Sequence, residues 1–146
     1  SEIIQLQDKL TQENKYTSWF RTDSQSKRVI YSGIYGTCLL PSGLTCVKAV
    51  FPLPQGNATV ILTPRVGSNG ELILTSSGAK HGDAGFYFLI KDTSSIVWSQ
   101  YIQSFEDELI VSFSENKLSA VQILTLFGIK VVQFRYAMTL KKTQES

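Results

Sequence analysis

Apolar and polar residues alternate with a period of two through most of this chain, most clearly between Gly85 and Leu140. β-Branched and aromatic residues occupy many of the apolar positions, and short polar turns divide the stretch into five segments. A period of two places successive side chains on opposite faces of a strand. The pattern therefore predicts five consecutive antiparallel strands, at residues 85–92, 95–102, 107–114, 117–124 and 129–140.

The same period begins at Arg28 and predicts four earlier strands, at residues 28–40, 44–52, 58–66 and 71–77. Turn-forming residues separate these strands. Pro41-Ser42-Gly43 predicts a three-residue hairpin loop, and Ser68-Asn69-Gly70 predicts a second tight turn. Residues 78–84 are rich in glycine and predict a wider loop.

The N-terminal segment has a different pattern. Ile3, Leu6 and Leu10 recur at helical spacing, and Ser1 is a residue type that caps helices. We expect a short helix over residues 2–15, followed by aromatic residues that anchor it to the core. Residues 1–20 would then be a helix with its anchor, residues 28–141 the strands, and residues 1–146 a single domain.

About nine strands joined by tight turns make an all-β, mainly antiparallel, up-and-down meander. An open meander of this length leaves two exposed edges, and closure removes them, so we expect a small closed or nearly closed barrel. In strand count and connection lengths this shape is similar to the lipocalin and fatty-acid-binding-protein folds, and so calycin-like. The resemblance implies an interior that holds one small ligand. A helix-grip fold would need an amphipathic helix near the C-terminus, but residues 129–140 alternate as a strand does.

Charge and motifs exclude several classes of function. The net charge is +2, and basic residues are scattered apart from Lys141-Lys142, which argues against nucleic-acid binding. No segment has the apolar length of a membrane span. Neither a P-loop nor a G-x-G-x-x-G motif occurs, so we predict no nucleotide cofactor. The sequence leaves compartment and oligomeric state open.

The two cysteines come together if Pro41-Ser42-Gly43 is the hairpin loop, because Cys38 then lies opposite Cys46. Opposed positions on antiparallel strands are close enough for a disulfide. We expect a disulfide in an oxidising compartment and two buried thiols in a reducing one. Two cysteines and a single histidine do not make a zinc site, so no metal is predicted.

His81 and Asp83 lie in the glycine-rich loop, where they form either an acid–base pair at a barrel mouth or an ordinary polar loop. No nucleophile-elbow motif accompanies them. The ordinary loop is the simpler interpretation.

A second group of candidates lies within the strands. We expect Lys48 to face water and Arg135 to be an internal polar anchor for a ligand head group, since buried polar groups need hydrogen-bond partners. If Phe127-Gly128 is a two-residue loop, the last hairpin pairs Leu126 with Ile129, Leu124 with Val131, Gln122 with Gln133, Ala120 with Arg135 and Ser119 with Tyr136. The predicted ligand-binding residues are Arg135, Tyr136, Trp98, Phe86, Phe88, Gln122 and Gln133.

Three functions follow as hypotheses. The first is non-catalytic binding of a hydrophobic or amphiphilic molecule, lipid-like or pigment-like, inside the barrel. The second is a small barrel-mouth enzyme of the isomerase or cyclase type that uses His81 and Asp83. The third is a protein–protein interaction or assembly module with Leu124, Ile129 and Val131 on its surface.

Overall fold

The computed structural model describes residues 2–138, which form eleven antiparallel strands and contain no helix, and therefore none that could cross a membrane. This confirms the all-β antiparallel class. The strands are β1 (Glu2–Gln7), β2 (Asn14–Thr22), β3 (Val29–Leu39), β4 (Thr45–Leu53), β5 (Gly56–Val66), β6 (Leu72–Thr75), β7 (Gly85–Lys91), β8 (Val97–Ile102), β9 (Phe105–Ser114), β10 (Lys117–Leu126) and β11 (Ile129–Met138). The predicted Ser1 cap and the predicted strand residues 139–141 lie outside the described residues.

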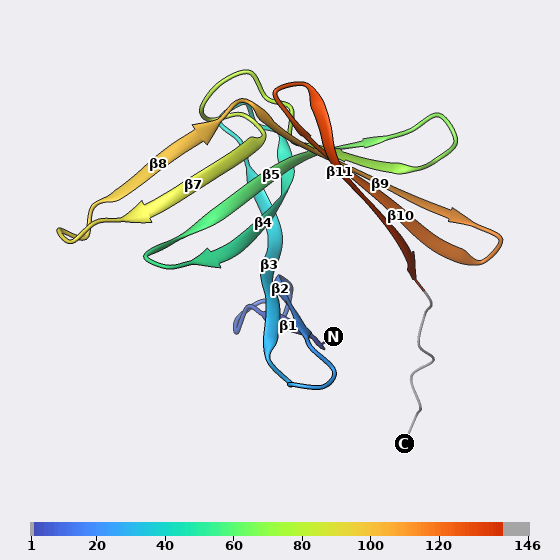
Figure 1. The fold of residues 1–146 in the computed structure, drawn as a ribbon, viewed down its shortest axis with the longest axis horizontal. Helices are drawn as coiled ribbons and strands as arrows, with labels where there is room; N and C mark the ends of the chain where they lie inside the picture. The colour runs from blue at the N-terminus through green and yellow to red at the C-terminus, as the bar shows by residue number, and fades with distance from the viewer. Residues whose placement is uncertain (1, 139–146) are drawn as a thin grey trace.

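Strand β5 divides the sheet into two branches, as Figure 1 shows across the centre of the molecule. One edge of β5 pairs with β4. The other edge is shared: Gly56–Ile61 pairs with β7, and Thr63–Val66 pairs with β6. One branch therefore runs from β1 to β5 and on to β7 and β8, whereas the other continues from β6 to β9, β10 and β11.

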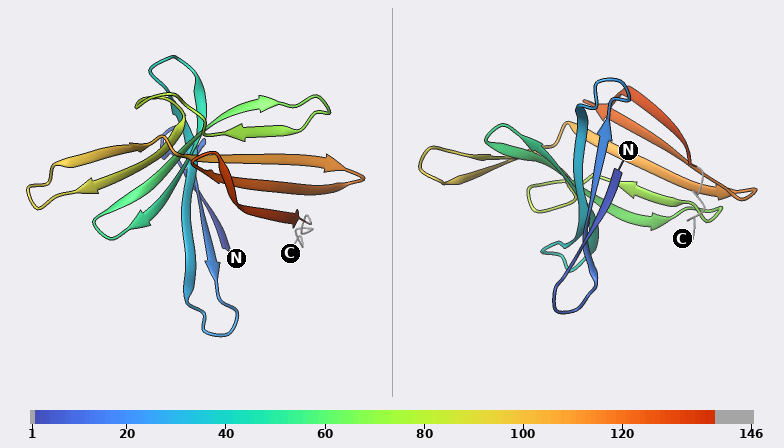
Figure 2. Two further views of the ribbon diagram at one scale, coloured as in Figure 1. Left: turned by 45° about the horizontal axis from the view of Figure 1, so that its top comes forward. Right: turned by 90° about the horizontal axis from the view of Figure 1, so that it is seen from below.

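The predicted closed barrel is wrong, because the sheet is not closed. Its branches end at β1, β8 and β11, each of which pairs with a single neighbour among the described residues. Both views in Figure 2 show the hairpins pointing outward in different directions. A barrel needs one continuous path of strands around its wall, and the shared edge of β5 breaks that path. The structure therefore confirms an antiparallel sheet but not a lipocalin-like barrel.

The predicted N-terminal helix is also wrong, and its two replacement strands raise the count from about nine to eleven. β1 and β2 form a hairpin in which Ile3 pairs with Trp19. The turn is built at Asp8, whose carboxylate accepts hydrogen bonds from the backbone N–H groups of Leu10 and Thr11. Leu10 is 93% exposed in this turn, so only Ile3 and Leu6 remain of the apolar stripe that predicted a helix. β-Branched Ile3 and Ile4 favour the strand instead.

The first long hairpin has the predicted register. Gly43 takes a φ of 85°, and the Gly43 N–H donates to Leu40 O across the three-residue loop. The register then pairs Cys38 with Cys46, as the loop length predicts. Turn geometry alone fixes this part of the fold.

The last hairpin departs from prediction beyond its turn. The Phe127-Gly128 turn pairs Leu126 with Ile129 as expected, but a bulge then shifts the register by one residue, so that Leu124 pairs with Val132. Ala120 therefore pairs with Tyr136, and the predicted pairing of Ser119 with Tyr136 is wrong. A one-residue shift exchanges the two faces of a strand. As a result the Tyr136 side chain lies on the same face as Gln122, rather than on the opposite one.

Two apolar clusters lie on opposite faces of the central strands. One contains Val60, Leu62 and Leu74, with Phe51 and Phe86 packed against it. The other contains Leu40, Cys46 and Ala84, with Cys38 and Ile61 packed against it. Because side chains alternate along a strand, β5 contributes Val60 to the first cluster and Ile61 to the second. Both faces of the sheet are therefore partly covered.

Candidate functional site

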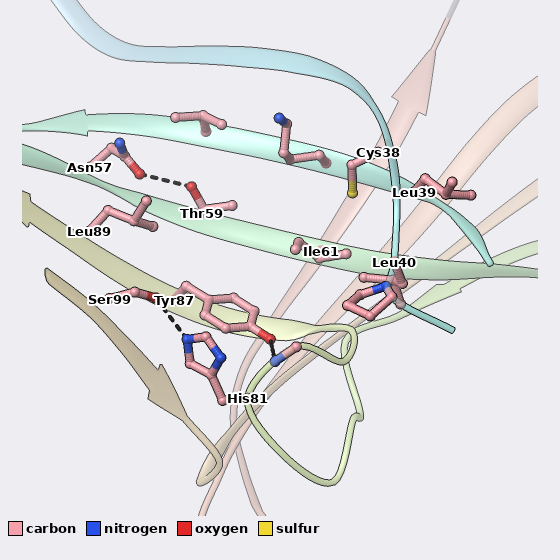
Figure 3. Close-up of a pocket in the computed structure, with 14 residues that line it drawn as sticks. Cys38, Leu39, Leu40, Asn57, Thr59, Ile61, His81, Tyr87, Leu89 and Ser99 are labelled. Carbon is pink, nitrogen blue, oxygen red and sulfur yellow. Dashed lines mark hydrogen bonds between the residues drawn. The ribbon is translucent and has the colours of Figure 1, made fainter. Parts of the chain in front are cut away.

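A groove of about 480 Å³ lies on the face of the sheet that carries the Cys46 cluster, and Figure 3 shows its lining. Strands β3, β4, β5, β7 and β8 form its floor. The loop after β6 and the β3–β4 hairpin also contribute. The lining residues are Cys38, Leu39, Leu40, Pro41, Lys48, Val50, Asn57, Thr59, Ile61, His81, Gly82, Tyr87, Leu89 and Ser99.

The strand register explains why these residues share one face. Val50 pairs with Thr59, which pairs on its other side with Tyr87. In the adjacent row Asn57 pairs with Leu89, which pairs with Ser99. Directly paired residues point to the same side of an antiparallel sheet. Backbone pairing therefore aligns the part of the floor that β4, β5, β7 and β8 form into rows.

The glycine-rich loop at residues 78–84 is fastened over one end of this floor. The Tyr101 hydroxyl donates to Gly78 O at 2.6 Å, and the Tyr87 hydroxyl donates to Asp83 O at 2.6 Å. The Gly82 N–H in turn donates to the Tyr87 hydroxyl at 3.0 Å. Burial raises the pKa of Tyr87 above its ordinary value, which keeps this hydroxyl protonated as a donor. The loop is thus held as a fixed wall of the groove.

His81 and Asp83 are engaged separately in this wall. His81 Nε2 lies 3.1 Å from Ser99 Oγ, and the imidazole packs edge-on against the Tyr87 ring. The Asp83 carboxylate accepts from the backbone N–H groups of Ala79 and Lys80, which is the ordinary turn role of aspartate. Figure 3 shows His81 reaching toward Ser99 across the floor. Both side chains therefore serve loop structure in this geometry.

The thiols of Cys38 and Cys46 are free, and Cys38 lines the groove while Cys46 is 1% exposed. Burial raises the pKa of the Cys38 thiol, and the nearby Cys46 raises it further. A thiol with a raised pKa is a weak nucleophile at neutral pH. The pair therefore packs as two small apolar side chains in this structure.

A polar network occupies the opposite, aromatic face of the sheet. Gln122 Nε2 donates to both oxygens of Asp107, at 3.0 and 2.9 Å, and the Tyr136 hydroxyl donates to Gln122 Oε1 at 3.1 Å. The Arg21 guanidinium lies 5.9 Å from the Tyr136 ring centre and 4.6 Å from that of Trp19. Because Arg21 is on β2 and Tyr136 on β11, these contacts join the two branches of the sheet.

The sequence-predicted ligand residues do not line the groove. Gln122 and Tyr136 belong to the polar network, whereas Phe86 packs edge-on against Phe88 and in a tilted arrangement against Phe105. Trp98 is 63% exposed and donates its indole N–H to Asp92. Two further predicted residues, Arg135 and Gln133, lie exposed side by side on β11. The predicted internal position of Arg135 is therefore wrong, because the β11 bulge turns it outward.

Sequence reasoning missed Lys48, which was expected to face water and instead lines the groove. The only available signal was its parity with Cys38: pairing of Cys38 with Cys46 puts Lys48, two residues further on, on the same face. From the strand positions alone, that face of the sheet is expected to be exposed to solvent. The 78–84 loop forms a wall at one end of this face, and no local pattern predicts where that loop lies.

Among residues 2–138 no group of three or more histidine, cysteine, aspartate or glutamate side chains is placed to hold a metal ion. No family model matches the chain, and no solved structure matches it. The chain is 30% identical over 142 residues to YndJ of Bacillus subtilis (strain 168), described as an uncharacterized membrane protein. The match covers 95% of this chain and 24% of YndJ, so the chain spans about a quarter of that protein's length.

Proposed function

We propose that this chain is a binding module that holds one amphiphilic small molecule in the groove, without changing it chemically. The observation that carries the proposal is the lining, in which apolar side chains from four strands, β3, β4, β5 and β7, surround a few polar groups such as Lys48, Asn57 and Ser99. Small-molecule sites are typically clefts of about 300–1,000 Å³ with this composition. A volume of about 480 Å³ falls within that range.

Catalysis at His81 and Asp83 has less support. General acid–base chemistry needs a side chain within reach of a bound reactant and free to exchange a proton with it. Asp83 is occupied by two backbone N–H groups, and His81 is paired with Ser99. The groove therefore offers binding surface without an assembled acid–base pair.

Similarity to part of a membrane protein is consistent with a module that works beside lipid and meets amphiphilic molecules there. The match covers only 24% of YndJ, so the activity and partners of the whole YndJ protein are not assigned to this chain.

The test is saturable binding of dansylaminoundecanoic acid, followed by dansyl fluorescence. Val50→Trp places a large ring in the groove floor and should weaken binding by about tenfold or more. Val66→Trp is the matched control, because Val66 is 77% exposed and lies outside the groove; its affinity should equal that of wild type. Absence of saturable binding by the wild-type protein, or equal affinity in Val50→Trp, would contradict the proposal.

A second candidate function is protein–protein interaction through β11. Ile129 and Val131 are 69% and 51% exposed, and Phe134 on the same edge strand is 45% exposed. Exposed apolar residues gathered on one strand are typical of interaction sites. Analytical ultracentrifugation tests self-association of this strand, and a Val131→Lys variant should disrupt any dimer that the wild type forms.

A further inference from the structure

Charge distinguishes the groove from a simple apolar cleft. Among the fourteen described residues that line it, Lys48 is the only lysine or arginine, and none is an aspartate or glutamate. The ion pairs found within residues 2–138 join Lys15 to Asp8 and Arg65 to Glu108, so Lys48 has no carboxylate partner there. The nearby Asp83 carboxylate is turned to backbone N–H groups of its own loop. The groove therefore has one uncompensated positive charge.

We propose that the ligand of this groove is a fatty-acid-like amphiphile whose carboxylate head pairs with the Lys48 ammonium and whose alkyl chain lies along the apolar floor. The inference rests on the function proposed above, and it adds the charge and chemical class of the ligand. The half-buried Lys48 ammonium has lost part of its hydration and has no carboxylate partner within the described residues. An anionic ligand would supply the missing favourable electrostatic interaction.

The position of Lys48 defines where the head group binds. Lys48 pairs with Gly36 on β3 and with Ile61 on β5, which places it on the β3–β4 side of the groove. Its charge also lowers the pKa of the Cys38 thiol against the larger effect of burial, so the ammonium acts near Cys38. The carboxylate is therefore expected at the Cys38 end of the groove.

The remaining lining provides the path for the alkyl chain. Val50, Ile61 and Leu89 are partly buried side chains on three successive strands of the floor. Beyond them lie Ser99 and His81, which are already hydrogen-bonded to each other. A tail running from Lys48 toward β8 thus meets apolar atoms first and a satisfied polar pair at its end.

A monoanionic head fits this site better than a phosphate. One lysine supplies a single point charge, whereas a dianionic phosphate commonly draws on arginine forks or several cations. The single positive charge of Lys48 therefore complements a monoanionic carboxylate.

The experiment compares dansylaminoundecanoic acid with its carboxamide, which has the same fluorophore and chain but no charge. Wild-type protein should bind the acid about tenfold more tightly than the amide at low salt, and added salt should narrow the difference. Lys48→Met should abolish the preference while still binding the amide. Lys48→Arg should retain it, and Lys117→Met, at an exposed lysine outside the groove, is the matched control.

Each outcome separates this inference from the proposed function. Equal affinity for acid and amide in the wild type overturns the carboxylate assignment and leaves a neutral-ligand groove. A preference that survives in Lys48→Met overturns the role of Lys48. Failure of both probes to bind contradicts the proposed function itself, and the inference with it.

Discussion

Asp107 is a carboxylate in a buried setting, and Asp107→Asn tests whether that burial raises its pKa. The residue is 8% exposed, and its backbone N–H donates to Ser76 Oγ at 2.7 Å. Burial raises its pKa from 3.8 to about 6, and the neutral amide of Gln122 offsets that effect only in part. The ionised form is thus held by a neutral amide instead of a cation.

The magnitude follows from the two pKa values. The difference between about 6 and 3.8 is roughly two units, and each unit corresponds to about 1.4 kcal/mol, so the shift amounts to about 3 kcal/mol. The folded state binds the proton more tightly than the unfolded state. Stability from this group is therefore fully present below about pH 4 and is lost as the pH rises through about 6.

The asparagine introduced by Asp107→Asn removes the charge and keeps the shape. If the Gln122 amide turns over, the new side-chain amide can donate to Gln122 Oε1, and Gln122 Nε2 can donate to the Tyr136 hydroxyl, which then accepts in place of donating. The free energy of unfolding of Asp107→Asn relative to wild type should therefore increase by up to about 3 kcal/mol between about pH 4 and pH 8.

Urea unfolding of both proteins at several pH values measures this difference directly. Carboxylates with lowered pKa values, Asp8, Asp23, Glu71 and Asp92, make stability rise with pH in both proteins and cancel in the comparison. Glu106→Gln removes an exposed neighbouring carboxylate and is the matched control. A difference between wild type and Asp107→Asn that stays constant over this pH range would refute the buried-carboxylate reasoning.

Two further predictions concern the groove wall and the thiols. A Cβ on Gly85 would clash with the Tyr101 ring. Gly85→Ala should therefore displace Tyr101 from Gly78 O, destabilise the fold by about 1–3 kcal/mol and speed amide exchange in residues 78–84. Unchanged amide exchange in that loop would contradict this prediction. Diamide should join Cys38 to Cys46, detected as a two-hydrogen mass loss, and raise the free energy of unfolding by about 2–3 kcal/mol because the bond closes a short loop. Failure to cross-link in the folded state would show that the two strands do not hold this register in solution.

How much the sequence could predict depends on whether a feature is local. The three-residue loop ending at Gly43 sets the register of β3 and β4, so the pairing of Cys38 with Cys46 could be predicted from turn chemistry. At the C-terminus the turn was equally clear, but Val131 is an extra residue in a bulge, and the register beyond it moved by one. A bulge leaves no sure mark in a pattern of period two. The prediction for Tyr136 failed for that reason alone.

The N-terminal error has a related cause. Three apolar residues at helical spacing, Ile3, Leu6 and Leu10, can also lie along a strand and its turn. The choice depends on whether a partner strand is present. Residues 2–7 form a strand because they pair with β2, with Ile3 opposite Trp19. Such tertiary contacts override a weak local preference for helix.

The sequence by itself determined that this protein is antiparallel β structure, and it placed most strands and turns, because alternation and turn residues act over a few positions. Tertiary structure decided that the sheet divides at β5, that the 78–84 loop walls one end of the groove, and that Lys48 lines that groove. β6 pairs with β9 across more than thirty residues, and β5 shares one edge between two partners. Such contacts are chosen by how distant side chains pack together, and no short stretch of the chain encodes that choice.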